Sequence, residues 1–297
     1  MNLPHLHGIV PPLATPLLED RTLNERGLAR LVRFQLDSGV HGLWALGTTA
    51  RFDLLPDRIQ RRVAECVAEE AGGRVPLVVN VSDMGTARVL DRARMFDDLS
   101  YDYYAVLPPW YQPMTTAEVG DFYRSLADSL AKPLVIYNAP WICNQLGFDL
   151  LRDLAAHPRI VGCKDVTPAL NRALDWPAEE RRSLGFSYLH GNDLLALSTG
   201  LGADGFVTSL SNPFPELMVA QWNAARSGDA AESFRLLVKA MRLGRIGGFG
   251  SYLACLEAAC RHRGLFDRML PEPLRSLDPP ADRRVADLLE AEGIRRI

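Results

Sequence analysis

The stretch Arg159-Ile-Val-Gly-Cys-Lys-Asp165 decides the fold, because its apolar run is typical of a buried parallel strand, while the lysine near its end is unusual in a core. Similar runs alternate with helical patterns from the start of the chain to about residue 225. These runs are Gly8–Thr15, Gly42–Leu46, Val75–Asn80, Tyr103–Leu107, Pro133–Tyr137, Phe186–Gly191 and Gly205–Thr208. Together with Ile160–Lys164 they make eight β/α units, which predict an α/β protein with a closed (β/α)8 TIM barrel.

Amphipathic segments lie between the predicted strands and indicate the helices of the barrel. They are Glu25–Ser38, Pro56–Ala71, Thr86–Leu99, Thr116–Leu130, Phe148–Ala156, Asp193–Leu201 and Pro213–Arg226, while Trp176-Pro177 interrupts the sixth helical segment, Pro168–Leu184. The competing fold is an open doubly wound sheet, which usually carries a glycine-rich phosphate turn after its first strand. No such turn follows Gly8–Leu17, so the pattern favours the barrel.

The alternation stops after the eighth unit, and three helix-like segments follow it. They are Asp229–Met241, Ser251–Arg263 and Asp282–Glu292. We therefore predict two parts, a catalytic barrel over residues 1–226 and a C-terminal helical extension over residues 227–297 that packs on it.

The composition restricts the class of partner. Of 297 residues 47% are hydrophobic and 23% charged, as in an ordinary folded protein, and a net charge of -3 gives no basic excess for nucleic acid. Five cysteines form no CxxC pair, and their odd number disfavours a disulfide framework. No apolar run reaches the roughly 18 residues of a membrane span, and the N-terminus lacks a signal-peptide pattern. We expect a cytoplasmic protein that binds a small molecule and neither nucleic acid nor membrane.

The residues that can carry chemistry follow the predicted strands, because the active site of a parallel barrel lies at the carboxyl ends of its strands. Lys164 ends the sixth strand and Tyr137 the fifth. Neighbouring strands lie about 4.8 Å apart, so amine and phenol can meet over the barrel mouth. The apolar residues before Lys164 disfavour a charged amine, and a neutral amine forms a Schiff base with a ketone. Tyr137, with the hydroxyls of Thr48 and Tyr111, is the candidate for proton transfer.

The triplet Gly47-Thr48-Thr49 follows the second strand and offers backbone N–H groups and hydroxyls that suit a carboxylate. Capture of a ketone and a carboxylate predicts a 2-oxo acid, of which pyruvate is the smallest, with an aldehyde as the second reactant. No cofactor and no metal would be needed. The purely structural alternatives are an ion pair between Lys164 and Asp165, packing of Tyr137 in the core, and a simple turn at the triplet.

Three motifs occur in the order found in a known family: Gly47-Thr-Thr49, Tyr137-Asn-Ala-Pro140 and Ile160–Asp165. Through them the chain resembles, over nearly its whole length, the dihydrodipicolinate synthase / N-acetylneuraminate lyase family of class I Schiff-base aldolases. Further matching stretches are PPLATPL near the N-terminus, Pro108–Pro113, Gly191–Asp193 and Gly202–Asn212.

The resemblance implies a role for each matching residue. Lys164 would form the imine and Tyr137 would transfer protons. Thr48 would link Tyr137 to Tyr111, which in several family members reaches across from a neighbouring subunit. Thr49 and the backbone from Gly47 on would hold the carboxylate of the oxo acid, and the backbone of Val207 would touch pyruvate. The family is typically tetrameric, so a homo-oligomer is implied.

Departures from the family pattern concern the second substrate. The usual GTTGE ends here in Ala50-Arg51, and the arginine of YNVPxRTG that holds aspartate semialdehyde is replaced by Ile142 or Gln145, depending on alignment. The GYDE of sialic-acid lyases is Gly191-Asn-Asp-Leu194 here, although Ser209 matches a sugar-contacting serine. Trp110, Trp141 and Ile142 near the expected mouth suggest a less charged, hydrophobic aldehyde.

We therefore predict a carbon–carbon or carbon–oxygen lyase that acts on a 2-oxo acid through Lys164, with a second substrate other than aspartate semialdehyde. The alternatives are a genuine 4-hydroxy-tetrahydrodipicolinate synthase and a non-catalytic 2-oxo-acid-binding paralogue. A metal-dependent aldolase or hydrolase is disfavoured, because of six histidines only His190 lies near the carboxyl end of a strand.

Overall fold

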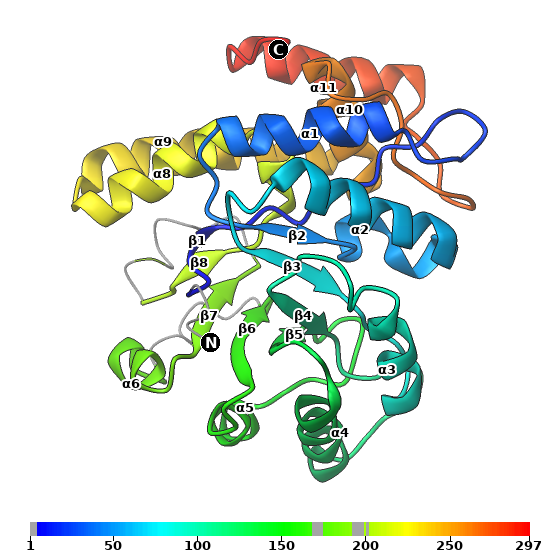
Figure 1. The fold of residues 1–297 in the computed structure, drawn as a ribbon. Coiled ribbons are helices and arrows are strands. Elements are labelled where there is room, and N and C mark those ends of the chain that lie inside the picture. The colour runs from blue at the N-terminus through cyan, green and yellow to red at the C-terminus, as the bar shows by residue number, and fades with distance from the viewer. Residues whose placement is uncertain (1–4, 168–174, 192–198, 200–201) are drawn as a thin grey trace.

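The sheet is an eight-stranded parallel one, curled so that its first strand pairs with its last. The computed structural model describes residues 5–167, 175–191, 199 and 202–297. The strands follow the order β1-β8-β7-β6-β5-β4-β3-β2 (Figure 1). They are β1 (Gly8–Ile9), β2 (Leu43–Ala45), β3 (Leu77–Asn80), β4 (Tyr103–Val106), β5 (Leu134–Asn138), β6 (Ile160–Asp165), β7 (Ser187–His190) and β8 (Gly205–Phe206).

The segment after β1 continues the sheet toward β2. A parallel bridge joins Pro12 to Trp44, where the Trp44 N–H donates to the Pro11 carbonyl and the Leu13 N–H donates to the Trp44 carbonyl, both at 2.9 Å. Between β1 and β8 the backbones approach closely, since a Cβ on Gly205 would lie 2.5 Å from the carbonyl oxygen of Gly8. The predicted barrel with C-terminal helices is confirmed, and each observed strand lies within a predicted one, except that β5 and β6 extend one residue further, to Asn138 and Asp165.

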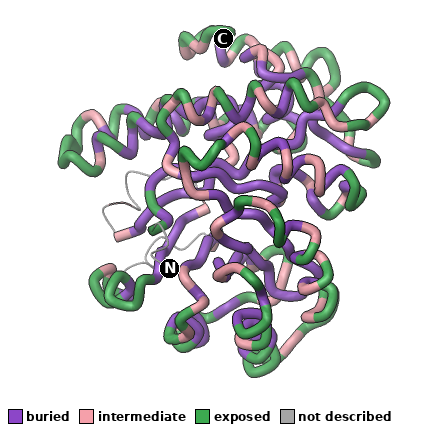
Figure 2. The backbone as a smooth tube through the Cα atoms, viewed as in Figure 1, coloured by how far each residue is buried: buried purple, intermediate pink, exposed green. Residues whose placement is uncertain are grey.

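Helices surround the strands, whose residues are buried almost throughout (Figure 2). They are α1 (Glu25–Asp37), α2 (Asp57–Ala71), α3 (Thr86–Arg94), α4 (Thr116–Ser129), α5 (Phe148–Ala155), α6 (Ala178–Ser183), α8 (Pro215–Ser227), α9 (Ala230–Gly244), α10 (Tyr252–Arg263) and α11 (Pro279–Ala291). Local signals start several of them, such as the capping box that Thr115 and Glu118 form at α4. In the part of the chain described, no helix combines the length and apolarity that crossing a membrane requires.

Several helix predictions differ from the structure or lie partly outside it. Of the segment predicted over Pro168–Leu184, residues 168–174 fall outside the described residues, and α6 covers only Ala178–Ser183. The helix predicted over Thr86–Leu99 ends at Arg94, and the N–H of Phe96 donates to the Ala93 carbonyl in a tighter turn that leaves the Phe96 ring fully buried. The segment predicted over Asp193–Leu201 falls outside the described residues except for position 199.

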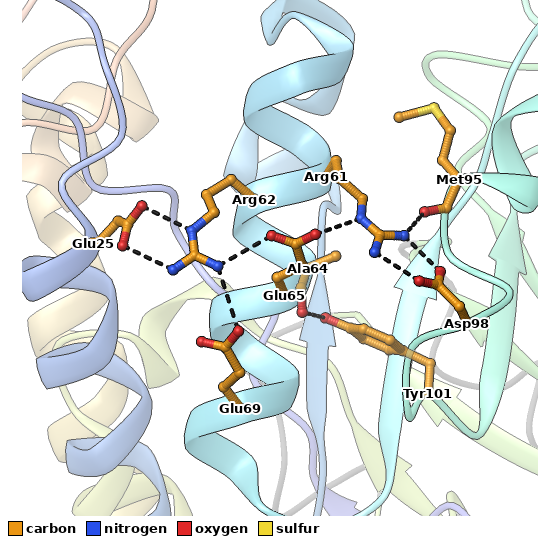
Figure 3. Close-up of polar contacts among 9 residues, drawn as sticks. All are labelled: Glu25, Arg61, Arg62, Ala64, Glu65, Glu69, Met95, Asp98 and Tyr101. Atoms are coloured by element: carbon orange, nitrogen blue, oxygen red, sulfur yellow. Dashed lines mark hydrogen bonds and ion pairs between the residues drawn. The ribbon is translucent and has the colours of Figure 1, made fainter.

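An arginine–carboxylate network fastens α2 to its neighbours (Figure 3). Arg62 forms two hydrogen bonds with Glu25 at the start of α1, and Arg61 forms two with Asp98 beyond α3. Both arginines also bond Glu65 on α2 itself. The arginine hydrogen bonds lower the pKa values of all three carboxyl groups, to about 2 for Asp98. The network therefore strengthens the outer ring of helices above acidic pH.

The C-terminal helices pack beside α1 and α8 (Figure 1). Arg263, at the end of α10, pairs with Glu216 on α8, and its guanidinium lies 5.2 Å from the centroid of the Phe34 ring on α1. Arg30 of α1 donates to the Gly264 carbonyl at 2.8 Å. These contacts attach the extension to the outside of the barrel, and the division at residues 226 and 227 stays a prediction.

Candidate active site

Lys164 and Tyr137 lie side by side at the carboxyl ends of two paired strands. The register of β5 and β6 places Tyr137 directly opposite Lys164. The amine nitrogen Nζ lies 3.9 Å from the centroid of the Tyr137 ring. Only 4% of Lys164 and 3% of Tyr137 are exposed. The strand pairing thus brings a buried amine and a buried phenol into direct contact.

The amine has no carboxylate partner in the described part of the chain. Among the residues that the structure describes, no Asp or Glu oxygen lies within 4 Å of the Lys164 nitrogen. Asp165 points to the other face of the strand, where it accepts hydrogen bonds from Tyr188 (2.7 Å) and Asn138 (3.1 Å). Burial without pairing is unusual for lysine, so the ion-pair alternative has no support in this geometry.

Gly191 provides the space that the lysine side chain occupies. A Cβ at this position would lie 3.3 Å from Cε of Lys164 and 1.9 Å from Cγ1 of Val166. A side chain here would force Lys164 or the backbone after β6 to move. The glycine at the end of β7 therefore helps to define where the amine lies.

Trp44 on β2 completes the surroundings of the amine, and the sequence did not identify it. Its ring centroid lies 5.3 Å from the Lys164 nitrogen and 5.7 Å from the Tyr137 ring, which it meets edge to face. Trp44 is fully buried, and its indole N–H has no hydrogen-bond acceptor among the described residues. The signal in the sequence is weak, because a tryptophan in a strand is usually only part of the core.

Thr48 fixes the phenol of Tyr137. The two hydroxyl oxygens lie 3.0 Å apart across the barrel mouth. Thr48 begins a short 3₁₀ turn, η1 (Thr48–Ala50), that starts after Gly47, and a Cβ on Gly47 would lie 3.3 Å from the Trp44 indole. Within the described part of the chain, the backbone N–H groups of Thr48 and Thr49 have no acceptor. The turn that supplies the Thr48 hydroxyl therefore also carries two backbone N–H groups that no described acceptor occupies.

Backbone strain flanks this turn on both sides. Leu46 and Arg51 adopt left-handed conformations, with φ values of 58° and 54°. Each such non-glycine residue costs of order 1–3 kcal/mol and is found mostly where the surrounding structure enforces it, often at functional sites. The positive φ values hold Gly47–Ala50 between two sharp turns, and no motif in the sequence indicated either turn.

Tyr111 and Val207 are the remaining predicted site residues. Tyr111 is 78% exposed, and within the described chain it forms no hydrogen bond with Thr48. Its predicted link through a neighbouring subunit stays a prediction. Val207 is buried directly after β8, and its N–H donates to the His190 carbonyl at 2.8 Å. Only its carbonyl is therefore left to approach a ligand.

A pocket of about 340 Å³ opens next to Thr48. It is lined by Thr48, Arg51, Phe52, Asp53, Leu107, Trp110, Ile142 and Leu253. Two of the three apolar residues predicted at the mouth, Trp110 and Ile142, are in this wall, whereas Trp141 is not and is 61% exposed. The volume is within the range of small-ligand sites, about 300–1,000 Å³.

The described residues contain no group of three His, Cys, Asp or Glu side chains arranged for a metal ion. His190, the one histidine near a strand end, packs its ring against Tyr188 and Phe206, with centroids 5.2 Å and 6.2 Å away. The chemistry of the site is thus that of an amine, a phenol and hydroxyls.

Comparison with known proteins agrees with this geometry. The model of the dihydrodipicolinate synthetase family matches residues 5–292. The chain belongs to the dihydrodipicolinate synthetase family. A DapA-like lyase of Halobacterium salinarum, itself uncharacterized, is 32% identical over 92% of this chain and 90% of its own length. Membership makes the protein an enzyme of the lyase kind.

Solved structures of the dihydrodipicolinate synthetase family superpose closely. The dihydrodipicolinate synthase of Bacteroides thetaiotaomicron is 31% identical with a TM-score of 0.90, covering 98% of this chain and all of that one. The synthase of Acinetobacter baumannii, solved in complex with pyruvate, is 25% identical with a TM-score of 0.89 over 98% of this chain and all of that one. The predicted resemblance to this family is therefore confirmed.

Proposed function

We propose that the protein is a class I lyase that binds pyruvate or another 2-oxo acid as an imine on Lys164 and makes or breaks a carbon–carbon bond to an aldehyde. The observation that carries this proposal is the Lys164 amine, which is buried, has no carboxylate partner among the described residues and lies 3.9 Å from the centroid of the Tyr137 ring. A lysine amine without an ion-pair partner at the mouth of a barrel can serve as the nucleophile toward the ketone of a 2-oxo acid.

The roles of the other residues follow from their positions. The Lys164 amine attacks the 2-oxo carbon, and the oxygen leaves as water with one proton from the amine and one from the Tyr137 phenol. The resulting iminium accepts the electron pair of a C–H bond of the neighbouring methyl group, the Tyr137 phenolate takes the proton, and an enamine forms. Thr48, 3.0 Å from the phenol oxygen, orients Tyr137 for both proton transfers. The N–H groups of Thr48 and Thr49 are the donors for the oxo-acid carboxylate.

The pyruvate complex of the Acinetobacter baumannii synthase supports a 2-oxo acid as the first substrate. From the same family we infer a homo-oligomer in which Tyr111 of a neighbouring subunit approaches Thr48. We also infer that the Val207 carbonyl approaches the oxo acid. The enzyme would work in the cytoplasm without a cofactor. A genuine 4-hydroxy-tetrahydrodipicolinate synthase is the second candidate, supported by the Bacteroides thetaiotaomicron synthase at 31% identity.

Deuterium exchange tests the proposal without knowledge of the second substrate. The enamine regains a proton from solvent at its methylene carbon, so the enzyme in D₂O should exchange the methyl protons of pyruvate, as followed by proton NMR. A Lys164→Arg variant keeps a long basic side chain but has no amine that can form the imine, so it should not exchange. Equal exchange by the wild type and by this variant would contradict the proposal, whereas binding of pyruvate without exchange would support the non-catalytic alternative.

A further inference from the structure

The pocket beside Thr48 is built mainly from apolar side chains of distant segments. Phe52 lies in the 3₁₀ turn η2 (Phe52–Leu54), Trp110 follows β4, Ile142 follows β5, and Leu253 comes from α10 of the extension. The rings of Phe52 and Trp110 meet edge to face with centroids 6.3 Å apart. Four separate segments thus converge on one apolar wall next to the hydroxyl that holds Tyr137.

Two charged residues line the pocket, and they neutralise each other. Arg51 donates to both carboxylate oxygens of Asp53, from Nε at 2.9 Å and from an η nitrogen at 2.6 Å. The Asp53 hydrogen bonds raise the pKa of the Arg51 guanidinium, so its charge is present at every working pH. Because Arg51 already forms two hydrogen bonds with Asp53, it has few donors left for the carboxylate of a ligand. The negative charge of Asp53 also repels such a carboxylate.

The surroundings of Ser209, near the Leu253 side of the pocket, offer little to a sugar. Ser209, which matches a sugar-contacting serine in sialic-acid lyases, lies in the 3₁₀ turn η4 (Ser209–Ser211) and has its hydroxyl 2.7 Å from the Tyr252 hydroxyl of α10. Tyr252 directly precedes Leu253, which lines the pocket. The extension therefore occupies this serine and supplies an apolar residue in the same place.

We propose that this pocket receives an uncharged aldehyde with an aromatic or branched aliphatic side chain, and that Asp53 prevents Arg51 from binding the carboxylate of a charged aldehyde. The inference rests on the proposed function, because it concerns the second reactant of the same site. Burial of an apolar side chain against Phe52, Trp110 and Leu253 supplies the binding energy.

The bond changes balance with groups already present. The enamine carbon derived from the pyruvate methyl attacks the aldehyde carbon, and the aldehyde oxygen takes the proton of the Tyr137 phenol. Water then hydrolyses the imine, which returns the Lys164 amine and releases a 4-hydroxy-2-oxo acid. Cleavage of that acid follows the same steps in reverse, and neither direction needs an oxidant or a reductant.

Competition among aldehydes tests this inference. The wild-type enzyme is incubated with pyruvate and, separately, benzaldehyde, glyceraldehyde or aspartate semialdehyde, and the condensation product is measured by mass spectrometry. We expect the highest kcat/KM for benzaldehyde. Trp110→Ala should lower that value about 10-fold or more, because even the loss of a single methylene contact in an apolar pocket has an effect of that size. Phe234→Ala, an aromatic truncation at a residue 54% exposed on α9, is the matched control and should not lower it.

The Asp53→Asn variant tests the role of the ion pair through an expected gain of activity with a charged aldehyde. Release of Arg51 should raise the kcat/KM for aspartate semialdehyde relative to benzaldehyde by several-fold. Asp91→Asn removes the carboxylate of a comparable exposed pair, with Arg94 on α3, and should leave this ratio unchanged.

The outcomes separate this inference from the proposed function. Deuterium exchange of pyruvate together with a preference for aspartate semialdehyde or glyceraldehyde overturns the inference and leaves the proposed function intact. An unchanged ratio in Asp53→Asn overturns the role of the ion pair. Loss of exchange in the wild type overturns both proposals, and exchange by each variant shows that its barrel is folded.

Discussion

Replacement of Thr48 by valine removes one hydroxyl and almost nothing else. Valine matches the shape of threonine, but it leaves the Tyr137 phenol, 3% exposed, without the partner now 3.0 Å away. An unsatisfied buried polar group costs about 1–3 kcal/mol. If that cost raises the barrier of the proton-transfer step, the rate should drop roughly 5- to 150-fold, because about 1.4 kcal/mol corresponds to a tenfold change in rate.

The assay is the exchange of pyruvate methyl protons for deuterium, since it reports imine and enamine formation without any aldehyde. Thr48→Ser keeps a hydroxyl at the same position and is the matched control, which should retain exchange within a few-fold of the wild type. Wild-type exchange in Thr48→Val would refute the argument that this hydroxyl orients Tyr137. A loss in Thr48→Ser as large as that in Thr48→Val would also contradict the argument, because serine keeps the hydroxyl and lacks only the methyl group.

Two further predictions concern the support of the site and of the fold. Gly191→Ala should abolish deuterium exchange and lower the free energy of unfolding, measured by urea denaturation, by about 1–3 kcal/mol, because its Cβ would meet Val166 at 1.9 Å and Lys164 at 3.3 Å. The hydrogen bonds with Arg61 lower the pKa of Asp98 from 3.8 to about 2. Asp98 should therefore contribute to the free energy of unfolding above pH 4, and this contribution should be lost as the pH falls through 2. Arg61→Gln should therefore reduce the difference in urea midpoint between pH 6 and pH 2.

Each of these two predictions has a control in the same chain. Gly85 has nothing within 4 Å of an added Cβ, so Gly85→Ala should preserve exchange and stability; a loss as large as that of Gly191→Ala would contradict the steric argument. Arg58 lies on α2 beside Arg61 but forms no ion pair among the described residues. Arg58→Gln should leave the pH dependence intact, and an equal effect of both variants would discredit the network.

The sequence predicted the strands well because each one carries its own apolar run, and it predicted Lys164 because a lysine that ends such a run is conspicuous. Tyr137 followed from the adjacency of the fifth and sixth strands, which the observed register of β5 and β6 bears out. The helix after Thr86 was predicted too long, since its apolar pattern continues past Arg94 while the backbone turns to bury Phe96.

What the sequence did not predict depends on contacts between distant segments or on backbone conformation. Trp44 could not be separated from ordinary core residues until the barrel placed it beside the amine. Arg51 pairs with Asp53 while its own backbone is in the left-handed conformation. A sequence does not indicate this conformation at a residue other than glycine. The contribution of Leu253 requires α10 to reach the barrel mouth, a tertiary arrangement that no local pattern contains.

The most direct measurement is reductive trapping of the imine. The chain has only three lysines, Lys132, Lys164 and Lys239, so peptide mass mapping after treatment with pyruvate and sodium borohydride can assign the adduct without ambiguity. We predict a reduced pyruvate adduct on Lys164, which is the buried one of the three, and no adduct in Lys164→Arg. An adduct on Lys132 or Lys239 alone, or on no lysine with any 2-oxo acid tested, would contradict the central claim that Lys164 is the Schiff-base nucleophile.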